Sequence, residues 1–186
     1  MKKGIKYLRA AILCFAVMTL LCGVIYTAAV TGAAQLFFPE QANGSIVSIT
    51  LKDGTVRKYG SELLAQEFTK AEYLIGRPSG VTNLSPTSEE QETLVKQRIA
   101  WWQSFDPSNK ADIPMDLVTG SGSGVDPNIS PQAAEYQVAR ISKARQISED
   151  TVREIIHTYT SGRFLGFIGE PGVNVLKVNL ALDGLL

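Results

Sequence analysis

The chain has 186 residues, and its 18 basic and 18 acidic side chains give a formal net charge of zero. Four of the cations precede residue 10, so the rest of the chain carries 14 basic against 18 acidic residues. This balance gives no sign of the clustered basic face that nucleic-acid binding requires. Both cysteines, Cys14 and Cys22, lie near the N-terminus, so disulfide and zinc–thiolate sites are excluded for everything after them.

An apolar segment is the first predicted element. Residues 10–39 contain no charged side chain, and about 20 apolar helical residues cross a hydrocarbon core of about 30 Å. We therefore predict a transmembrane helix with its interface over residues 10–38. Lysine and arginine are retained on the cytoplasmic side, and four of them precede the segment: Lys2, Lys3, Lys6 and Arg9. The prediction is a single-pass protein of the cell membrane, with residues 1–9 in the cytoplasm and residues 39–186 as one extracytoplasmic domain.

A cleaved signal peptide is the alternative, because Thr31-Gly32-Ala33 resembles a cleavage site. The uninterrupted apolar run from Ala10 to Tyr26 is longer than the usual core of about 7–15 residues in such peptides. This length favours an uncleaved anchor. A lipoprotein is disfavoured, because Cys14 and Cys22 each follow a leucine where a small residue is needed.

Four small residues recur at every fourth position of this segment: Thr19, Gly23, Thr27 and Thr31. In lipid, such residues allow two helices to approach closely. They form a candidate face for docking on another transmembrane helix. Chance alignment stays open, because glycine, alanine and threonine are frequent in membrane spans.

The domain is expected to begin with a β-hairpin. Ser45–Leu51 and Thr55–Tyr59 are β-prone, and the Asp-Gly pair in Lys52-Asp53-Gly54 predicts the turn between them. Gly60–Phe68 follows with helical spacing, although it is short. Gly76–Pro86 is rich in turn-forming residues and is expected to be a loop.

A helix is predicted next. Thr87 or Ser88 can cap its start, with Glu90 or Gln91 three residues later in the spacing of a capping box, and Asp106-Pro107 ends it. Its apolar face contains Leu94, Val95, Ile99, Trp102 and Phe105.

Two more helices and two strands complete the prediction. Ser130-Pro131 and Ser148 each open a helix, the first with proline at a favoured position. Ile113–Val118 and Val173–Leu182 are predicted as strands. The expected core residues of the two helices are Ala134, Val138 and Ile141, then Val152, Ile155, Ile156 and Tyr159. The predicted fold class is α+β, with helices covering a small mixed sheet.

The glycine-rich Thr119–Gly124 segment could cradle an anion with its backbone N–H groups. It lacks the Gly-Lys-Ser/Thr ending of a phosphate loop, so a flexible connection is favoured. Three acids around it, Asp112, Asp116 and Asp126, could bind a hard cation, although scattered surface acids are the favoured interpretation. His157 is the single histidine and is expected to be a polar position on a helix.

Two further features indicate contacts rather than catalysis. Arg77-Pro78 lies in a constrained loop, where arginine commonly anchors a carboxylate bidentately, either inside the fold or across an interface. Trp101-Trp102 is expected to send one indole into the core and leave the other for a partner contact or partial exposure. No catalytic, cofactor-binding or metal-ligating residue is predicted. The residues by themselves therefore favour an anchored accessory or interaction domain.

Several segments together resemble the KdpC family, the small subunits of bacterial potassium-importing Kdp ATPases. They cover nearly the whole chain in the family's order: Phe38–Val47 (FPEQANGSIV), Gly60–Thr69 (GSELLAQEFT), Gly76–Ser79 (GRPS), Asp116–Arg145 (DLVTGSGSGVDPNISPQAAEYQVARISKAR) and Gly169–Asp183 (GEPGVNVLKVNLALD).

The resemblance implies a complex with a potassium-binding channel-like subunit, a P-type ATPase subunit and a small helical subunit. ATP and K⁺ would be handled by that complex, and members of this family are described as catalytic chaperones that raise the ATP affinity of the ATPase subunit. Because ATP is cytoplasmic, we expect assembly and gating on the outer side, with any effect on ATP transmitted through the transmembrane partners. The candidate interface or structural motif comprises Gly76, Arg77, Pro78, Ser79, Asp116, Gly122, Gly124 and Asp126.

The chain also departs from the family. Many members carry a longer insert with a Ser-Gly-Gly-Ser run where only Gly80–Pro86 remains here, which weakens a direct contact with ATP. Gly172 stands where members often have arginine. A membrane-anchored binding or sensor domain that acts alone remains the alternative function.

Overall fold

The structure is a computed structural model that describes residues 2–186, with side chains from residue 4 onward. It divides into two compact units, residues 1–45 and residues 46–186, and each unit is described by itself.

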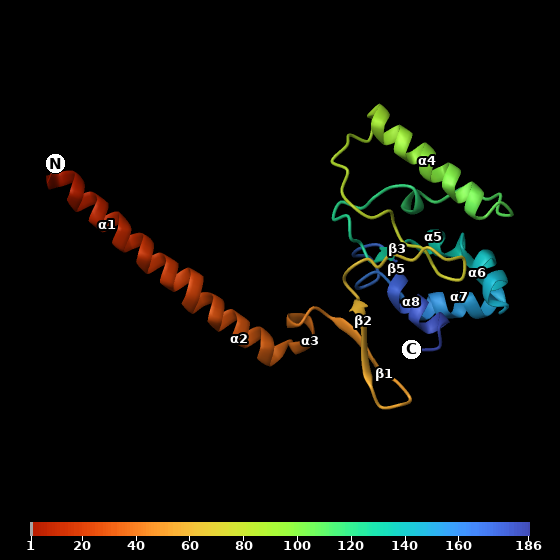
Figure 1. Cartoon of the computed structure of the whole chain (residues 1–186), viewed down its shortest axis with the longest axis horizontal. Helices are drawn as coiled ribbons and strands as arrows, with labels where there is room; N and C mark the ends of the chain where they lie inside the picture. Colours follow the sequence, from red (N-terminus) through yellow and green to blue (C-terminus); the bar gives the residue numbers. More distant parts are fainter. Residues whose placement is uncertain (1) are drawn as a thin grey trace. The chain divides into compact units, whose positions relative to one another are not determined.

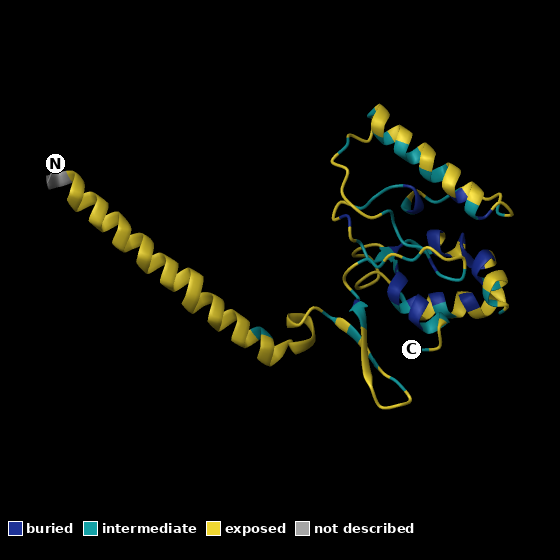
Figure 2. Ribbon diagram, viewed as in Figure 1, coloured by how far each residue is buried: buried dark blue, intermediate teal, exposed yellow. Residues whose placement is uncertain are grey.

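The first unit is one continuous helical run followed by a short helix (Figure 1). It comprises α1 (Lys2–Met18), the π-helix η1 (Thr19–Tyr26), α2 (Thr27–Phe37) and α3 (Pro39–Ala42). The break at Phe38, whose φ is −138°, precedes Pro39, since a residue before proline avoids the helical region. Within the described residues, Gly4–Phe37 is the one helix long and apolar enough to cross a membrane, and its apolar window is not buried against protein (Figure 2).

The second unit begins with the predicted hairpin, formed by β1 (Ile46–Thr50) and β2 (Val56–Ser61). The carboxylate of Asp53 accepts hydrogen bonds from the backbone and hydroxyl of Thr55 at 2.9 and 2.7 Å, and Gly54 has a φ of +82°. The Asp-Gly prediction is therefore confirmed. The short helix considered for Gly60–Phe68 is wrong, because β2 continues to Ser61 and turns and irregular backbone follow.

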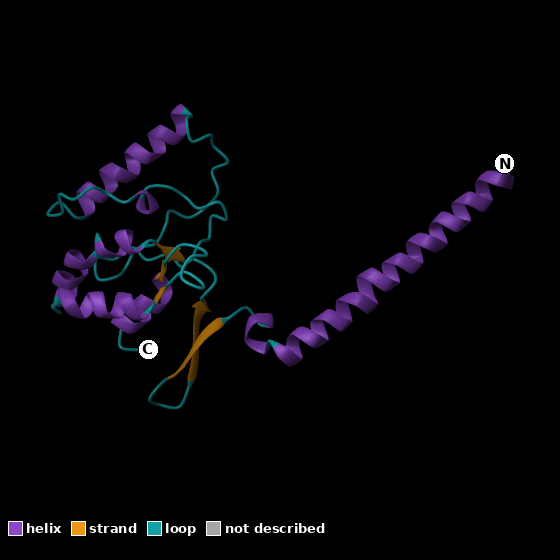
Figure 3. Cartoon of the chain, turned by 180° about the vertical axis from the view of Figure 1, so that it is seen from behind, coloured by secondary structure: helices purple, strands orange, loops and turns teal. Residues whose placement is uncertain are grey.

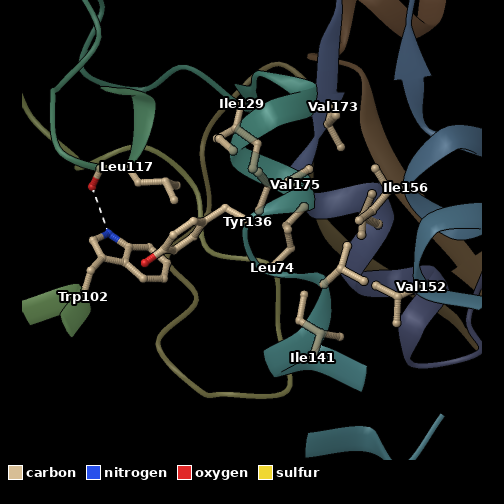
Figure 4. Close-up of a cluster of buried hydrophobic side chains, with 14 of the residues drawn as sticks. Leu74, Trp102, Leu117, Ile129, Tyr136, Ile141, Val152, Ile156, Val173 and Val175 are labelled. Atoms are coloured by element: carbon tan, nitrogen blue, oxygen red, sulfur yellow. Dashed lines mark hydrogen bonds between the residues drawn. The ribbon is translucent and has the colours of Figure 1, made fainter. Parts of the chain in front are cut away.

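Helix α4 (Glu89–Phe105) begins at the predicted cap, where the Ser88 hydroxyl accepts the N–H of Gln91. The reciprocal half of a capping box is not formed, since the Ser88 N–H donates to the carbonyl of Ser85. Trp102 on the predicted face is buried, and its indole N–H donates to the Leu117 carbonyl at 3.1 Å (Figure 4).

A three-stranded antiparallel sheet lies at the centre of the second unit. Its order is β3 (Asn128–Ile129), β5 (Gly172–Asn174), β4 (Thr160–Ser161). In Figures 1 and 3, α4 lies on one side of β3 and β5, and α7 and α8 lie on the other. The fold class is the predicted α+β, with two small antiparallel sheets in place of one mixed sheet.

The helices after the glycine-rich loop are α5 (Pro131–Glu135), α6 (Val138–Arg145), α7 (Glu149–Thr158) and α8 (Val175–Leu182). Ser130 and Ser148 cap α5 and α7 as predicted, by accepting the N–H groups of Ala133 and Thr151. The single helix expected after Ser130 is divided at Tyr136 and Gln137. These helices provide most of the hydrophobic core (Figure 4), which includes the predicted residues Ala134, Val138, Ile141, Val152 and Ile156.

Of the two predicted late strands, Val173–Leu182 is wrong in most of its length and Ile113–Val118 in all of it. Val173–Leu182 forms a strand only up to Asn174, whose side chain then caps α8 by accepting the Lys177 N–H. Helix α8 is buried on most of its circumference, so its sequence lacks the polar face that reveals a helix. Ile113–Val118 contains the 3₁₀ helix η2 (Met115–Leu117). There the Met115 carbonyl accepts both the N–H and the hydroxyl of Thr119.

Candidate interaction site

The Gly76–Ser79 loop is placed by the segment before it, residues 71–75, which we call the strap. The strap is not paired with a strand. Its backbone N–H and carbonyl groups bind to buried side-chain amides instead. The Asn179 side chain accepts the N–H of Leu74 at 2.7 Å and donates to its carbonyl at 2.9 Å. Gln137 makes the same pair of bonds with Ile75, both at 2.9 Å. Since buried backbone groups must be paired, these two amides fix the direction in which the chain enters the loop.

Two arginines fix the start of the strap. The Arg140 guanidinium donates to the carbonyls of Ala71 and Tyr73, and burial lowers its pKa to about 10. Arg145 donates to the carbonyl of Glu72 at 2.6 Å and to the carboxylate of Asp183 at 2.7 Å. The strap is thus connected to α6 and to the end of α8.

Arg77 anchors a carboxylate inside the fold. Its Nη1 donates to Oδ1 of Asp116 at 3.2 Å, and the other carboxylate oxygen accepts the N–H of Ser130 at 2.7 Å. The pairing uses one carboxylate oxygen rather than the bidentate geometry expected. The Nη2 group donates to the hydroxyl of Thr119 and the carbonyl of Gly120, both at 3.4 Å. Arg77 and Asp116 therefore join the Gly76–Ser79 loop, η2 and the start of α5.

The glycine-rich segment packs against the same loop through its backbone. The Gly80 N–H donates to the carbonyl of Gly124 at 2.9 Å. A Cβ atom on Gly124 would lie 2.8 Å from the carbonyl carbon of Gly80, and the φ of Gly124 is +71°. Gly122, by contrast, has no atom within 4 Å of such a Cβ position. The segment is a close-packed connection at Gly124 and open at Gly122.

A cleft of about 590 Å³ lies beside these contacts. Its charged lining residues come from distant parts of the chain, and we call it the charged cleft: Arg77, Asp116, Asp126, Arg163 and Glu170. Asp126 accepts the N–H of Asn128 at 3.0 Å, and Arg163 pairs with Glu170 at 2.9 Å. The structure thus brings Arg77, Asp116 and Asp126 together.

Three more residues of the predicted motif line a second hollow. Gly76, Pro78 and Ser79 lie there with Trp101, in a space of about 220 Å³. Trp101 is 43% exposed, and its ring stacks on that of Phe105 with the ring centroids 4.6 Å apart. The prediction for the Trp101-Trp102 pair is confirmed, since Trp102 is buried in the core and Trp101 is partly exposed.

The remaining chemical candidates are not gathered here. Asp112 lines a different hollow, with Lys110 and Glu135, and His157 is exposed near the end of α7. Among residues 4–186, no group of three or more histidine, cysteine, aspartate or glutamate side chains could hold a metal ion.

The small-residue face lies on η1 and α2. A Cβ atom on Gly23 would be 3.9 Å from the methyl group of Thr19, so these two positions are neighbours along the helix. The hydroxyl of Thr27 donates to the carbonyl of Cys22 at 3.1 Å, five residues earlier. The accepting carbonyl lies in the π-helix η1, and π-helical turns inserted in α-helices are frequent at functional sites.

The residues that hold the strap were not predicted: Gln137, Arg140, Arg145, Asn179 and Asp183. A signal was present, because Gln137 and Arg140 stand among the apolar core residues Val138 and Ile141. A polar side chain at a core position of a helix indicates a buried partner. The sequence does not show which segment of the chain supplies that partner.

Fold and site together define a class of protein: a small α+β domain that follows a single helix with the length and composition of a membrane span. Its candidate residues join loops to one another. Comparison with known proteins gives the family. A sequence model of the KdpC family, described as the c chain of K⁺-transporting ATPases, matches residues 8–184.

The relatives match over their full length. A protein of Listeria welshimeri described as "Potassium-transporting ATPase KdpC subunit" is 56% identical, covering 100% of this chain and 99% of the relative. A protein of Clostridium perfringens with the same description is 50% identical, covering 97% of this chain and 98% of the relative. Another, of Methylococcus capsulatus, is 45% identical and covers 97% of this chain and 99% of the relative. The chain therefore belongs to the KdpC family.

Proposed function

We propose that the chain is a non-catalytic subunit of a high-affinity, ATP-driven potassium uptake complex, and that it acts in assembling and stabilising that complex. Membership of the KdpC family over residues 8–184 is the observation that carries the proposal. The relatives are described as subunits of a potassium-transporting ATPase. The proposed partners are a potassium-binding channel-like subunit, a P-type ATPase subunit and a small helical subunit.

The contacts of the candidate residues support a structural rather than a chemical role. The hydrogen bonds of the Arg77 and Asp116 side chains join three segments of the same domain. Gly124 is required for backbone packing. Such residues shape a surface, and we propose that Gly76–Ser79, Trp101 and the charged cleft belong to the surface that partner subunits recognise.

We further propose that residues 39–186 are extracytoplasmic and that Gly4–Phe37 remains as the anchor. The cations before the apolar segment support this orientation. ATP would then be bound on the other side of the membrane, so any effect of this subunit on ATP affinity would be transmitted through the transmembrane partners.

The test is to express the full chain together with the P-type ATPase and channel-like subunits proposed as its partners, and to purify it through an affinity tag in mild detergent. We expect the other subunits to co-purify in constant proportion. Deletion of the chain should abolish uptake at low external potassium, and the full chain should restore it. A chain that purifies alone, together with unchanged uptake in the deletion strain, would contradict the proposal.

A further inference from the structure

The loop between β4 and β5 presents apolar side chains to the surroundings instead of to the core. Four of them are strongly exposed: Phe164 (69%), Leu165 (70%), Phe167 (72%) and Ile168 (49%). We call these four residues, with Gly166 between them, the apolar tip. Exposed apolar clusters in soluble parts of proteins indicate contact with a partner or a membrane.

The backbone of the tip is a tight turn at an unfavourable position. Leu165 has a φ of +52° and Gly166 a φ of +83°. Positive φ at a turn is normally supplied by glycine, asparagine or aspartate, and leucine is disfavoured there. Because the Leu165 side chain is exposed, packing inside the domain does not explain the leucine. Strained positions of this kind cluster at functional sites.

The tip pairs part of its own backbone. Phe164 and Ile168 pair as an antiparallel bridge, and the N–H groups of Phe164, Gly166, Phe167 and Ile168 all donate to carbonyls within residues 163–168. A protein partner could supply such bonds from outside, whereas lipid cannot. Among the described residues, the N–H of Leu165 and the carbonyls of residues 165–167 have no such bond, so the tip suits the hydrated boundary between headgroups and acyl chains rather than the hydrocarbon core.

The residues at the base of the tip are charged, and charged side chains are compatible with the lipid headgroup region. Arg163 and Glu170 flank it, and both carboxylate oxygens of Glu170 accept from Nη2 of Arg163, at 3.1 and 2.9 Å. The pair holds the two sides of the loop together and belongs to the charged cleft. A long basic side chain at this position can reach lipid phosphates while the residues beyond it enter the apolar layer.

The chain keeps this domain next to a membrane. Residues 38–45 separate the end of α2 from the start of β1, and eight residues extend at most about 28 Å. We propose that the apolar tip inserts into the lipid bilayer that holds Gly4–Phe37, as a second point of attachment. The inference requires the anchor, but neither the orientation across the membrane nor the partner subunits.

The test uses the full chain in lipid nanodiscs, with Cys14 and Cys22 replaced by alanine. A Phe167→Cys variant carries an environment-sensitive fluorophore, and lipids with a nitroxide on the acyl chain act as quencher. We expect quenching at position 167. A matched label at Asp150→Cys, a side chain that is 95% exposed at the start of α7, should not be quenched.

A second variant separates insertion from folding. Leu165→Asn removes an apolar side chain and places a residue that tolerates positive φ, so the domain should unfold at the same or a higher temperature. Loss of one buried leucine should lower the equilibrium constant for insertion by about tenfold, seen as weaker quenching at position 167.

Absence of quenching in the labelled parent chain would overturn the inference. So would a label that is unaffected by lipid but becomes buried when the other subunits are added, because the tip would then bind protein. Either result would leave the proposed subunit function standing, since that function is tested by co-purification and uptake.

Discussion

At the scale of single residues, the candidate motif divides into positions that the fold needs and positions that it leaves open. Gly124 is buried with a φ of +71°, and the backbone of Gly80 lies where a Cβ atom would be. Gly122, two residues earlier, is exposed and has free space around its Cβ position. The same residue type in one short segment thus has two different roles.

Gly124→Ala should therefore destabilise the domain by about 2–4 kcal/mol, because alanine at positive φ and the contact with Gly80 both cost free energy. Urea unfolding of the full chain in detergent, followed by the fluorescence of Trp101 and Trp102, measures the change. Gly122→Ala is the matched control and should change stability by less than about 0.5 kcal/mol. Equal effects of the two substitutions would contradict the assigned packing.

The strap gives a second prediction at this scale. Asn179→Ala would leave the buried N–H and carbonyl of Leu74 without partners, which should lower the free energy of unfolding by about 2–4 kcal/mol. The same unfolding measurement applies. Gln103→Ala, an exposed amide on α4, serves as control, and an unaltered unfolding midpoint for Asn179→Ala would show that the amide does not hold the strap.

At the scale of elements, one carboxylate joins segments that the sequence separates. Asp116 in η2 accepts from Arg77 of the Gly76–Ser79 loop and from the backbone of Ser130 at the start of α5. The ion pair is mostly sheltered, with about a fifth of each side chain exposed. Its loss should therefore affect more than a surface ion pair would.

Asp116→Ala is expected to cost about 2–3 kcal/mol of stability, since it leaves Nη1 of Arg77 and the N–H of Ser130 without their acceptor. Asp126→Ala, which loses one bond to Asn128 two residues away, should cost less. If Arg77→Ala and Asp116→Ala are additive in the double variant, the proposed link between loop and helix is wrong.

The apolar helix Gly4–Phe37 gives another prediction. Gly23→Leu should loosen the association with partner subunits, because a large side chain on the small-residue face prevents close approach of a second helix. Gly32→Leu is the control, since it lies about 100° around the helix from Thr31. Co-purification in mild detergent measures both variants, and equal recovery of partners with each would count against a docking face at Gly23.

At the scale of the whole molecule, the chain combines a helix that is long and apolar enough to cross a membrane with a domain that has its own hydrophobic core. The strap, the three-stranded sheet and the helices α5–α8 form one core within residues 46–186. The cations before the helix predict on which side of the membrane this domain lies.

Topology is tested with a single cysteine. In a chain with Cys14→Ala and Cys22→Ala, Asp150→Cys should react with a membrane-impermeant maleimide in intact cells, because its side chain is almost fully exposed. Lys6→Cys should react only after the cells are opened. Reaction of position 150 only in broken cells would reverse the predicted orientation.

The sequence by itself predicted those features whose cause is local. A long uncharged run predicts a span, an Asp-Gly pair predicts a hairpin turn, and Ser88, Ser130 and Ser148 cap the helices that follow them. In each case the interacting groups lie within a few residues of one another, so their spacing along the chain is sufficient. The family resemblance is also a property of the sequence, and the comparisons confirm it.

Only the tertiary structure decided the rest, because the partners there are distant along the chain. Leu74 finds Asn179 more than a hundred residues away, and Arg77 meets Asp116 through a loop whose direction the strap sets. The alternation in Val173–Leu182 predicted a strand, and helix α8 has no polar face to contradict it because the helix is buried nearly all around. The apolar tip was missed for the converse reason: its residues look like core, and exposure is a property of the fold.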